Sequence, residues 1–250
     1  MDPDTDIGGP LHRFPVTSVS AIVAAGSSDV EVRQRGLETI VQSYWKPAYK
    51  YLRIRWQTSN EDAKDLTQGF FASAIEKNYF VAYDPSKASF QTFFRTCLDR
   101  FVANRKKADQ RIKRGAGVDH LSLDFQGVEG ELALALPANE LTAEEFFHRE
   151  WVRSLFTLAV DTLRELYNAS GRSVYFSLFE LYDLADDVEC QVSYATLASE
   201  FNLKTTDVTN YLAAARRDFK KILLEKVREL TASEDEFRAE ARSLLGVKIK

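Results

Sequence analysis

The chain has 250 residues, of which 45% are hydrophobic and 28% are charged, enough to build one or two ordinary hydrophobic cores. Its formal net charge of −4 excludes a protein that coats DNA unaided, because non-specific affinity comes mainly from neutralised phosphates. Any DNA binding must come from a local basic patch or be assisted by a partner. Cys97 and Cys190 lack the spacing of a zinc site or a disulfide framework.

The N-terminus has no apolar segment of signal-peptide length, and no stretch approaches the ~18 apolar residues that a membrane-spanning helix needs. We therefore expect a cytoplasmic protein with no membrane contact. Residues 1–28, rich in Pro, Gly, Ser, Thr and Asp, predict a loosely ordered arm with one short apolar run, from Val19 to Ala25, that could form a helical turn or two.

A helical period begins at Leu37 and continues to Leu52, with Pro47 expected to kink or split the helix. A second amphipathic helix is expected after the N-cap candidates of 58–62, and a loop follows over 78–89. The third helix begins at Phe90 with an aromatic face and ends in a basic run that extends to Arg114. Residues 29–114 are therefore expected to form one helical domain.

Residues 115–145 are acidic and lack a sustained apolar period, which predicts a linker between domains. The helical period resumes over 146–232, which we expect to form a second domain, and 233–250 predicts a short helix capped by Ser233 and ended by Gly246. The expected fold class is thus all-α, with two helical domains joined by an acidic linker and a helix-turn-helix in the C-terminal one.

The helix-turn-helix candidate covers residues 193–212. A tight crossing of two helices needs a small residue on the first helix, a left-handed residue at the turn and branched apolar anchors on the second. Ala198, Asn202, Val208 and Leu212 meet these demands in order. Polar and basic residues on the second helix suit base edges and phosphates, and a plain helical hairpin with a solvated basic face is the alternative.

The aromatic stripe that leads into the basic helix after Phe90 suits the binding of separated strands, since rings hold bases while cations follow the backbone. An aromatic stripe at helical spacing is also what a hydrophobic core requires, and most of these rings are expected to be core. No Gly-rich phosphate loop or metal-protease motif occurs, so we expect no enzymatic activity and no cofactor or metal.

The order of these parts resembles the extracytoplasmic-function class of RNA polymerase sigma factors, of the sigma-70 superfamily. The similarity includes the acidic helix Asp62 to Phe71, the aromatic-to-basic helix from Phe90 to Lys107, the acidic linker and the C-terminal helix-turn-helix. The flanking segments 11–17 and 236–246 resemble a subgroup common in bacteria with many Ser/Thr kinases. The resemblance implies a cytoplasmic factor that confers promoter recognition and DNA opening on bacterial core RNA polymerase.

The resemblance also implies roles for single residues. Those matching the polymerase-docking helix are Asp62, Asp65, Leu66, Gln68 and Phe71. Those matching the loop and helix that hold the −10 promoter element are Tyr83, Asp84, Ser89, Phe90, Arg95, Arg100, Asn104, Arg105, Lys106 and Lys107. Those matching the helix that reads the −35 element are Thr206, Asn210, Tyr211, Arg216, Arg217 and Lys220. The acids of the linker would lie in channels that nascent RNA later fills.

Two departures from the family pattern bear on these roles. Lys64 stands where an acid is common, which weakens the expected docking on polymerase, and Ala213 and Ala214 stand where cations are frequent. Thr67, two residues after Asp65 on a helix that has lost an acid, is a candidate phosphorylation site that would restore negative charge there. A hydroxyl bonded to its own helix is the alternative for Thr67.

Three functions follow from these features. The main one is a sigma factor, regulated by an anti-sigma factor or a Ser/Thr kinase because the chain contains no obvious sensor domain. A polymerase-independent helix-turn-helix regulator is the second, although it leaves the acidic helix and the basic helix without a role. An adaptor that binds partners but has lost DNA contact is the third.

Overall fold

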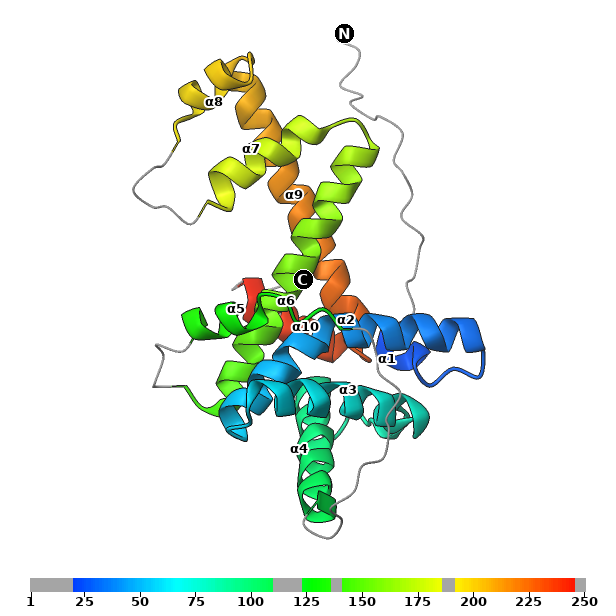
Figure 1. The fold of residues 1–250 in the computed structure, drawn as a ribbon. Coiled ribbons are helices and arrows are strands. Elements are labelled where there is room, and N and C mark those ends of the chain that lie inside the picture. Colours follow the sequence, from blue (N-terminus) through cyan, green and yellow to red (C-terminus); the bar gives the residue numbers. More distant parts are fainter. Residues whose placement is uncertain (1–19, 110–122, 136–140, 186–191, 246–250) are drawn as a thin grey trace.

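A computed structural model describes residues 20–109, 123–135, 141–185 and 192–245. Within these ranges every regular element is a helix and none is a strand, which confirms the all-α class (Figure 1). No helix in the described ranges combines the length and the apolar character needed to cross a membrane.

The amino-terminal part contains helices α1 (Ala21–Ala24), α2 (Val30–Arg55), α3 (Asn60–Glu76) and α4 (Phe90–Asp109), with the short 3-10 turn η1 (Tyr79–Ala82) between α3 and α4. The side chains of Asp29 and Ser59 cap α2 and α3, as their positions before the helical period suggest. Helix α2 continues through Pro47 as one element, so the expected split does not occur.

Helix α1 is the short helical turn expected in the apolar run, but it packs in the core, which corrects the expectation of a loose arm for residues 21–25. Ala21 and Ile22 are buried against α2, and a Cβ atom added at Gly36 would lie 2.6 Å from the carbonyl oxygen of Ala21. The two helix backbones therefore approach so closely that only glycine fits at position 36. The rest of the expected arm, residues 1–19, lies outside the described residues.

Aromatic rings fill the space where α2, α4 and α6 (Ala143–Ala169) meet. The ring of Tyr44 lies 4.6 Å from that of Phe94 and 6.2 Å from that of Trp151, measured between centroids. Phe70 of α3 meets Phe94 edge-to-face at 5.2 Å. These interactions favour a fixed crossing of the helices, because edge-to-face pairs constrain ring orientation.

The expected linker, residues 115–145, contains a helix, α5 (Val128–Ala135), that packs against α2. Its Glu131 forms ion pairs with Lys46 and Lys50, at 3.0 and 2.8 Å, and its Glu129 forms one with Arg53 at 2.7 Å. This part of the expected linker is therefore helical and attached to α2 through its acids, although it shows no sustained apolar period in the sequence.

Helix α6 starts at a capping box formed by Thr142 and Glu145 and runs for 27 residues, about 40 Å at 1.5 Å per residue. Its first half packs on α2 and its second half on α7 (Ser173–Asp183) and α9 (Thr205–Glu229). Helix α8 (Tyr194–Glu200) precedes α9, and α10 (Glu234–Leu245) follows it. Figure 1 shows α6 and α9 side by side along the length of the molecule.

The main core is a single cluster of buried side chains that extends from Ala21 to Ala241 and includes residues of α2, α6 and α9. The division into domains at 29–114 and 146–232 therefore remains a prediction, and α6 is the element that joins the two parts.

Candidate nucleic-acid interface

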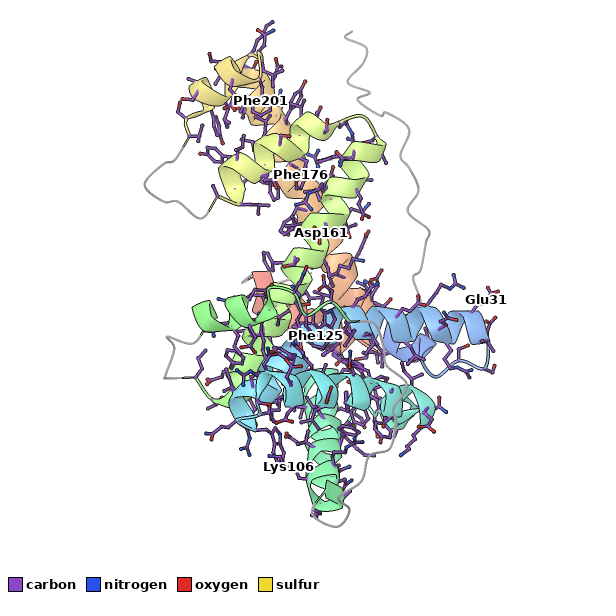
Figure 2. All side chains as sticks on the ribbon, in the orientation of Figure 1. Glu31, Lys106, Phe125, Asp161, Phe176 and Phe201 are labelled. Atoms are coloured by element: carbon purple, nitrogen blue, oxygen red, sulfur yellow. The ribbon has the colours of Figure 1, made fainter. Side chains whose placement is uncertain are left out.

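The basic end of α4 projects from the body of the molecule, as the position of Lys106 in Figure 2 shows. Four of the predicted residues there, Asn104, Arg105, Lys106 and Lys107, are exposed, and so is Arg100 one turn earlier. The ammonium of Lys106 lies 4.8 Å from the ring centroid of Trp56. The cations Arg111, Lys113 and Arg114 of the same basic run lie outside the described residues.

A groove of about 550 Å³ lies between α4 and the end of α3 with η1. Its walls combine half-buried aromatic side chains with polar and basic ones. The residues that line it include Tyr79, Phe93 and Phe101, together with Lys77, Arg100, Asn104 and Arg105. Rings beside cations are the surface that unstacked bases and their phosphates need.

The sequence assigned Phe93 and Phe101 mostly to the core, and the structure makes them partly buried walls of this groove. The positions of Phe93 and Phe101 could have been predicted from the helical spacing of the residues of α4. Phe94, Leu98 and Val102 form the fully buried row of α4, so Phe93, Cys97, Phe101 and Asn104 lie on the adjoining row, at the boundary between core and solvent. Tyr79, which precedes the helix, could not be placed by periodicity.

The side chain of Phe90, expected to contact the promoter, is only 1% exposed and packs in the core. Phe90 lies four residues before Phe94, on the buried row of α4, so the expectation that its side chain contacts the promoter is wrong. Arg95 is also turned inward, toward the Phe147 ring at 5.9 Å and Glu144 at 3.4 Å. Neither side chain reaches solvent in the way the basic end of α4 does.

The loop that precedes α4 is held by hydrogen bonds. Asp84 accepts them from the amide and the hydroxyl of Ser86, at 3.0 and 2.6 Å, and these bonds with that of Lys87 lower the pKa of Asp84 to about 2. The Tyr83 hydroxyl donates to the carbonyl of Ala88 and to Glu236 of α10, and Ser89 caps the first turn of α4. The expected base-capturing loop is thus a fixed structure.

The predicted polymerase-docking residues of α3 divide into two groups. Asp62 and Asp65 are exposed, and Leu66 and Gln68 are partly buried. Phe71 is fully buried among aromatic rings, so its side chain cannot contact a partner directly. Lys64 forms an ion pair with Glu61 at 3.0 Å.

Thr67 is fully buried, and its hydroxyl donates to the carbonyl of Ala63 at 2.7 Å. This confirms the alternative of a hydroxyl bonded to its own helix, and a kinase could not reach Thr67 on the folded helix. The row Ala63, Thr67, Phe70 and Ala74 follows the helical spacing of three and four residues, which places Thr67 on the core side.

Helices α8 and α9 are joined by a short turn in which Asn202 adopts a φ of 52°, the left-handed conformation predicted for it. Ala198, Val208 and Leu212 are buried between the helices, as expected. The turn lies at the end of the molecule opposite Lys106, near the label of Phe201 in Figure 2.

The exposed face of α9 carries Thr206, Asn210, Ala213, Arg217 and Lys220, which follow the helical spacing of three and four residues. Arg217 and Lys220 form no ion pair with any residue that the structure describes, so both are available to a ligand. Tyr211 stacks on Tyr175 at 4.0 Å and is partly buried.

Arg216 has a structural role instead. Its guanidinium donates from two nitrogens to the carboxylate of Asp183 at the end of α7, with distances between 2.9 and 3.2 Å. These hydrogen bonds raise the pKa of Arg216. The Arg216 side chain therefore fixes α7 against α9. Its partner is 33 residues away in the sequence, so helical periodicity could not predict the pair.

Two other observations limit the chemistry of the chain. No group of three or more His, Cys, Asp or Glu side chains within the described residues is arranged to hold a metal ion. Comparison with protein-family models, with curated proteins and with solved structures found no match. The functional case therefore depends on the two surfaces at the ends of α4 and α9.

Proposed function

We propose that this chain is a sigma-type initiation factor that confers promoter recognition on bacterial core RNA polymerase and helps to open the DNA. The observation that carries the proposal is the aromatic and basic groove beside α4. Its rings suit unpaired bases, and its arginines suit the phosphates between them. A protein that binds only duplex DNA has no use for such a groove.

The exposed face of α9 supports the same function. Thr206 and Asn210 can reach base edges in a major groove, while Arg217 and Lys220 can contact phosphates. The two surfaces lie at opposite ends of the molecule (Figure 2), as reading two separated promoter elements requires. The net charge of −4 suits a factor that gains DNA affinity only on a partner.

The direct test is run-off transcription with core polymerase on the promoter of the chain's own gene. Arg105→Ala should reduce transcript yield several-fold, because Arg105 lines the groove, whereas Arg35→Ala, an equal change of charge on α2, should leave it unchanged. Equal transcript yields from both variants and the wild type would contradict a role for the groove in transcription. A shift of duplex promoter DNA without polymerase would instead favour the helix-turn-helix regulator.

The face of α9 is tested separately. Arg217→Ala should lower the salt dependence of promoter binding by the polymerase complex by about one unit of slope, as the loss of one phosphate contact does. Arg216→Ala should leave that slope unchanged and weaken the packing of α7 on α9, because Asp183 occupies its guanidinium. The reverse pattern would place the DNA contact on Arg216.

Docking on polymerase is tested through the exposed acids of α3. Asp65→Lys should weaken the affinity for core polymerase more than Glu76→Lys, which makes the same charge change at the other end of the same helix. Equal affinities would rule out the predicted docking surface. Co-purification with polymerase without any transcript would favour the adaptor.

A further inference from the structure

Helix α10 folds back from the end of α9 and is fixed by its apolar face. Phe237 and Ala241, one turn apart, are buried in the main core. The guanidinium of Arg228 lies 3.9 Å from the ring centroid of Phe237 and forms an ion pair with Glu234 at 2.7 Å. These contacts set the direction in which the acidic face of α10 points.

That face covers the amino end of α4. One carboxylate oxygen of Glu236 accepts hydrogen bonds from the amide of Phe90 at 2.8 Å and from the Tyr83 hydroxyl at 2.9 Å. The other oxygen accepts from the amide of Ala232 at 2.9 Å. A carboxylate is stabilised at this position, because the first amides of a helix have no partner within it and carry partial positive charge.

One turn later, Glu240 extends the contact. Its carboxylate accepts a hydrogen bond from the side-chain amide of Gln91 at 3.0 Å, and the oxygen of that amide lies 3.1 Å from Nδ1 of His148 on α6. Helix α10 is thereby attached to the ends of both α4 and α6.

The covered region adjoins the groove beside α4. The ring of Tyr83, which Glu236 holds by its hydroxyl, packs against Phe93 at 5.3 Å, and Phe93 lines the groove. A DNA strand leaving the groove toward the amino end of α4 would bring its phosphates to the Phe90 amide, the position that the Glu236 carboxylate occupies. Two anionic groups cannot occupy this position together.

We propose that α10 is an autoinhibitory cover that excludes the backbone of a separated DNA strand from the amino end of α4. The proposal rests on the function proposed above, since it concerns the same strand. The cover competes with the strand by mimicry, with a carboxylate in place of a phosphate, and the exposed Asp235 adds repulsion. Engagement of the promoter requires α10 to leave.

The test uses the full chain and a matched pair of variants, Glu236→Lys and Asp235→Lys. Both change the charge of the same helix turn equally, but only Glu236 touches α4, and Asp235 is exposed. Affinity for a forked oligonucleotide with one single-stranded arm is measured by fluorescence anisotropy without polymerase, together with amide hydrogen exchange over residues 234–245.

Glu236→Lys should bind the fork at least about fivefold more tightly than Asp235→Lys, with faster exchange in α10. Equal binding by the two variants, or faster exchange without tighter binding, overturns the proposal. If Glu236→Lys proves unfolded by circular dichroism, the milder pair Glu236→Gln and Asp235→Asn decides by the same comparison.

Run-off transcription by the wild type separates this proposal from the proposed function. If the wild type gives promoter-dependent transcripts and both variants bind the fork equally, the autoinhibitory role of α10 is wrong and the proposed sigma function stands. If Glu236→Lys binds the fork more tightly but the wild type gives no transcript, the autoinhibitory role of α10 stands and the proposed sigma function is wrong.

Discussion

Two short acidic helices, α5 and α10, are each attached to the body of the molecule by a pair of glutamates, but the groups that receive the glutamates differ. Glu129 and Glu131 of α5 meet Arg53, Lys46 and Lys50. Among the interactions that the structure describes, Glu236 and Glu240 of α10 meet backbone amides, a tyrosine hydroxyl and a glutamine, and no Lys or Arg. The first contact joins carboxylates to cations, and the second joins carboxylates to uncharged hydrogen-bond donors.

The difference gives the two contacts opposite responses to pH. The hydrogen bond from Arg53 lowers the pKa of Glu129, and hydrogen bonds from Lys50 and Lys46 together outweigh burial to lower that of Glu131. Burial, followed by the charge of Glu236, raises the pKa of Glu240 to about 7. The α5 contact is therefore lost as pH falls through the lowered carboxyl pKa values, whereas the α10 contact weakens as pH rises through about 7.

The largest effect should come from the ion pairs at α5. Lys50 pairs with Glu131 and also with Glu150, whose side chain is 1% exposed. Lys50→Met should lower the free energy of unfolding by about 2–3 kcal/mol, because Glu150 keeps only arginine partners for a charge that remains buried. Urea denaturation measures the loss.

Lys46→Met is the control for Lys50, since among the described residues the ion-pair partner of Lys46 is Glu131, whose side chain is 45% exposed. Its loss should stay under about 1 kcal/mol, the range of surface pairs. Similar losses of unfolding free energy for the two variants would contradict the prediction. They would mean that the buried charge of Glu150 adds nothing to the contribution of Lys50.

The second effect concerns α10. Glu240→Gln mimics the protonated carboxyl, so at pH 8 the variant should be more stable than the wild type by about 1–3 kcal/mol, and at pH 4, below the ordinary carboxyl pKa, nearly equally stable. The ionisable groups near Glu240 are Glu236, Tyr44 and Tyr83, with His148 linked through Gln91. Urea denaturation at both pH values checks the prediction.

Glu234→Gln supplies the comparison for Glu240, because Glu234 is exposed and the hydrogen bond from Arg228 lowers its pKa. Its stability between pH 5 and pH 8 should follow that of the wild type. A Glu240→Gln variant that also follows the wild type over this range would contradict the assigned role of Glu240.

The smallest effect is the response to salt. About 1 M NaCl reduces the screening length to about 3 Å, which weakens partly exposed ion pairs but not neutral hydrogen bonds. Hydrogen exchange should therefore accelerate in residues 128–135 of α5 and change less in 234–245 of α10, where the described ion pairs, with Arg228 and Arg238, both belong to Glu234. Equal acceleration in both helices would mean that the contacts of Glu236 and Glu240 are weakened by salt as well.

Local sequence signals predicted much of the fold. Period and capping residues located α3, α4 and α10 within a few positions but missed α5, which lies in the expected linker. Asn202 was predicted to be left-handed because a tight turn between α8 and α9 requires it. Phe90 was misassigned, and Thr67 was left open between a phosphorylation site and a bonded hydroxyl, because each lies on a row whose inward direction depends on the neighbouring helix. That direction becomes visible only when α2, α3 and α4 are packed together.

The candidate site was predictable in composition but not in geometry. The basic end of α4 is a run of neighbours, which any reading along the chain detects. The pairing of Arg216 with Asp183 and the contact of Glu236 with Phe90 join residues 33 and 146 positions apart. Contacts of this range depend on chain topology, so no local pattern indicates that Arg216 is engaged or that α10 covers α4.

Under the proposed function, the long helices α6 and α9 have a further consequence for the length of DNA between two promoter elements. One added base pair moves an element by about 3.4 Å along the axis and by roughly 34° around it. Unbroken helices packed side by side stretch or twist little, so α6 and α9 hold the two ends of the molecule at a fixed distance and angle. A factor with this rigidity should discriminate among promoters by spacer length as well as by sequence.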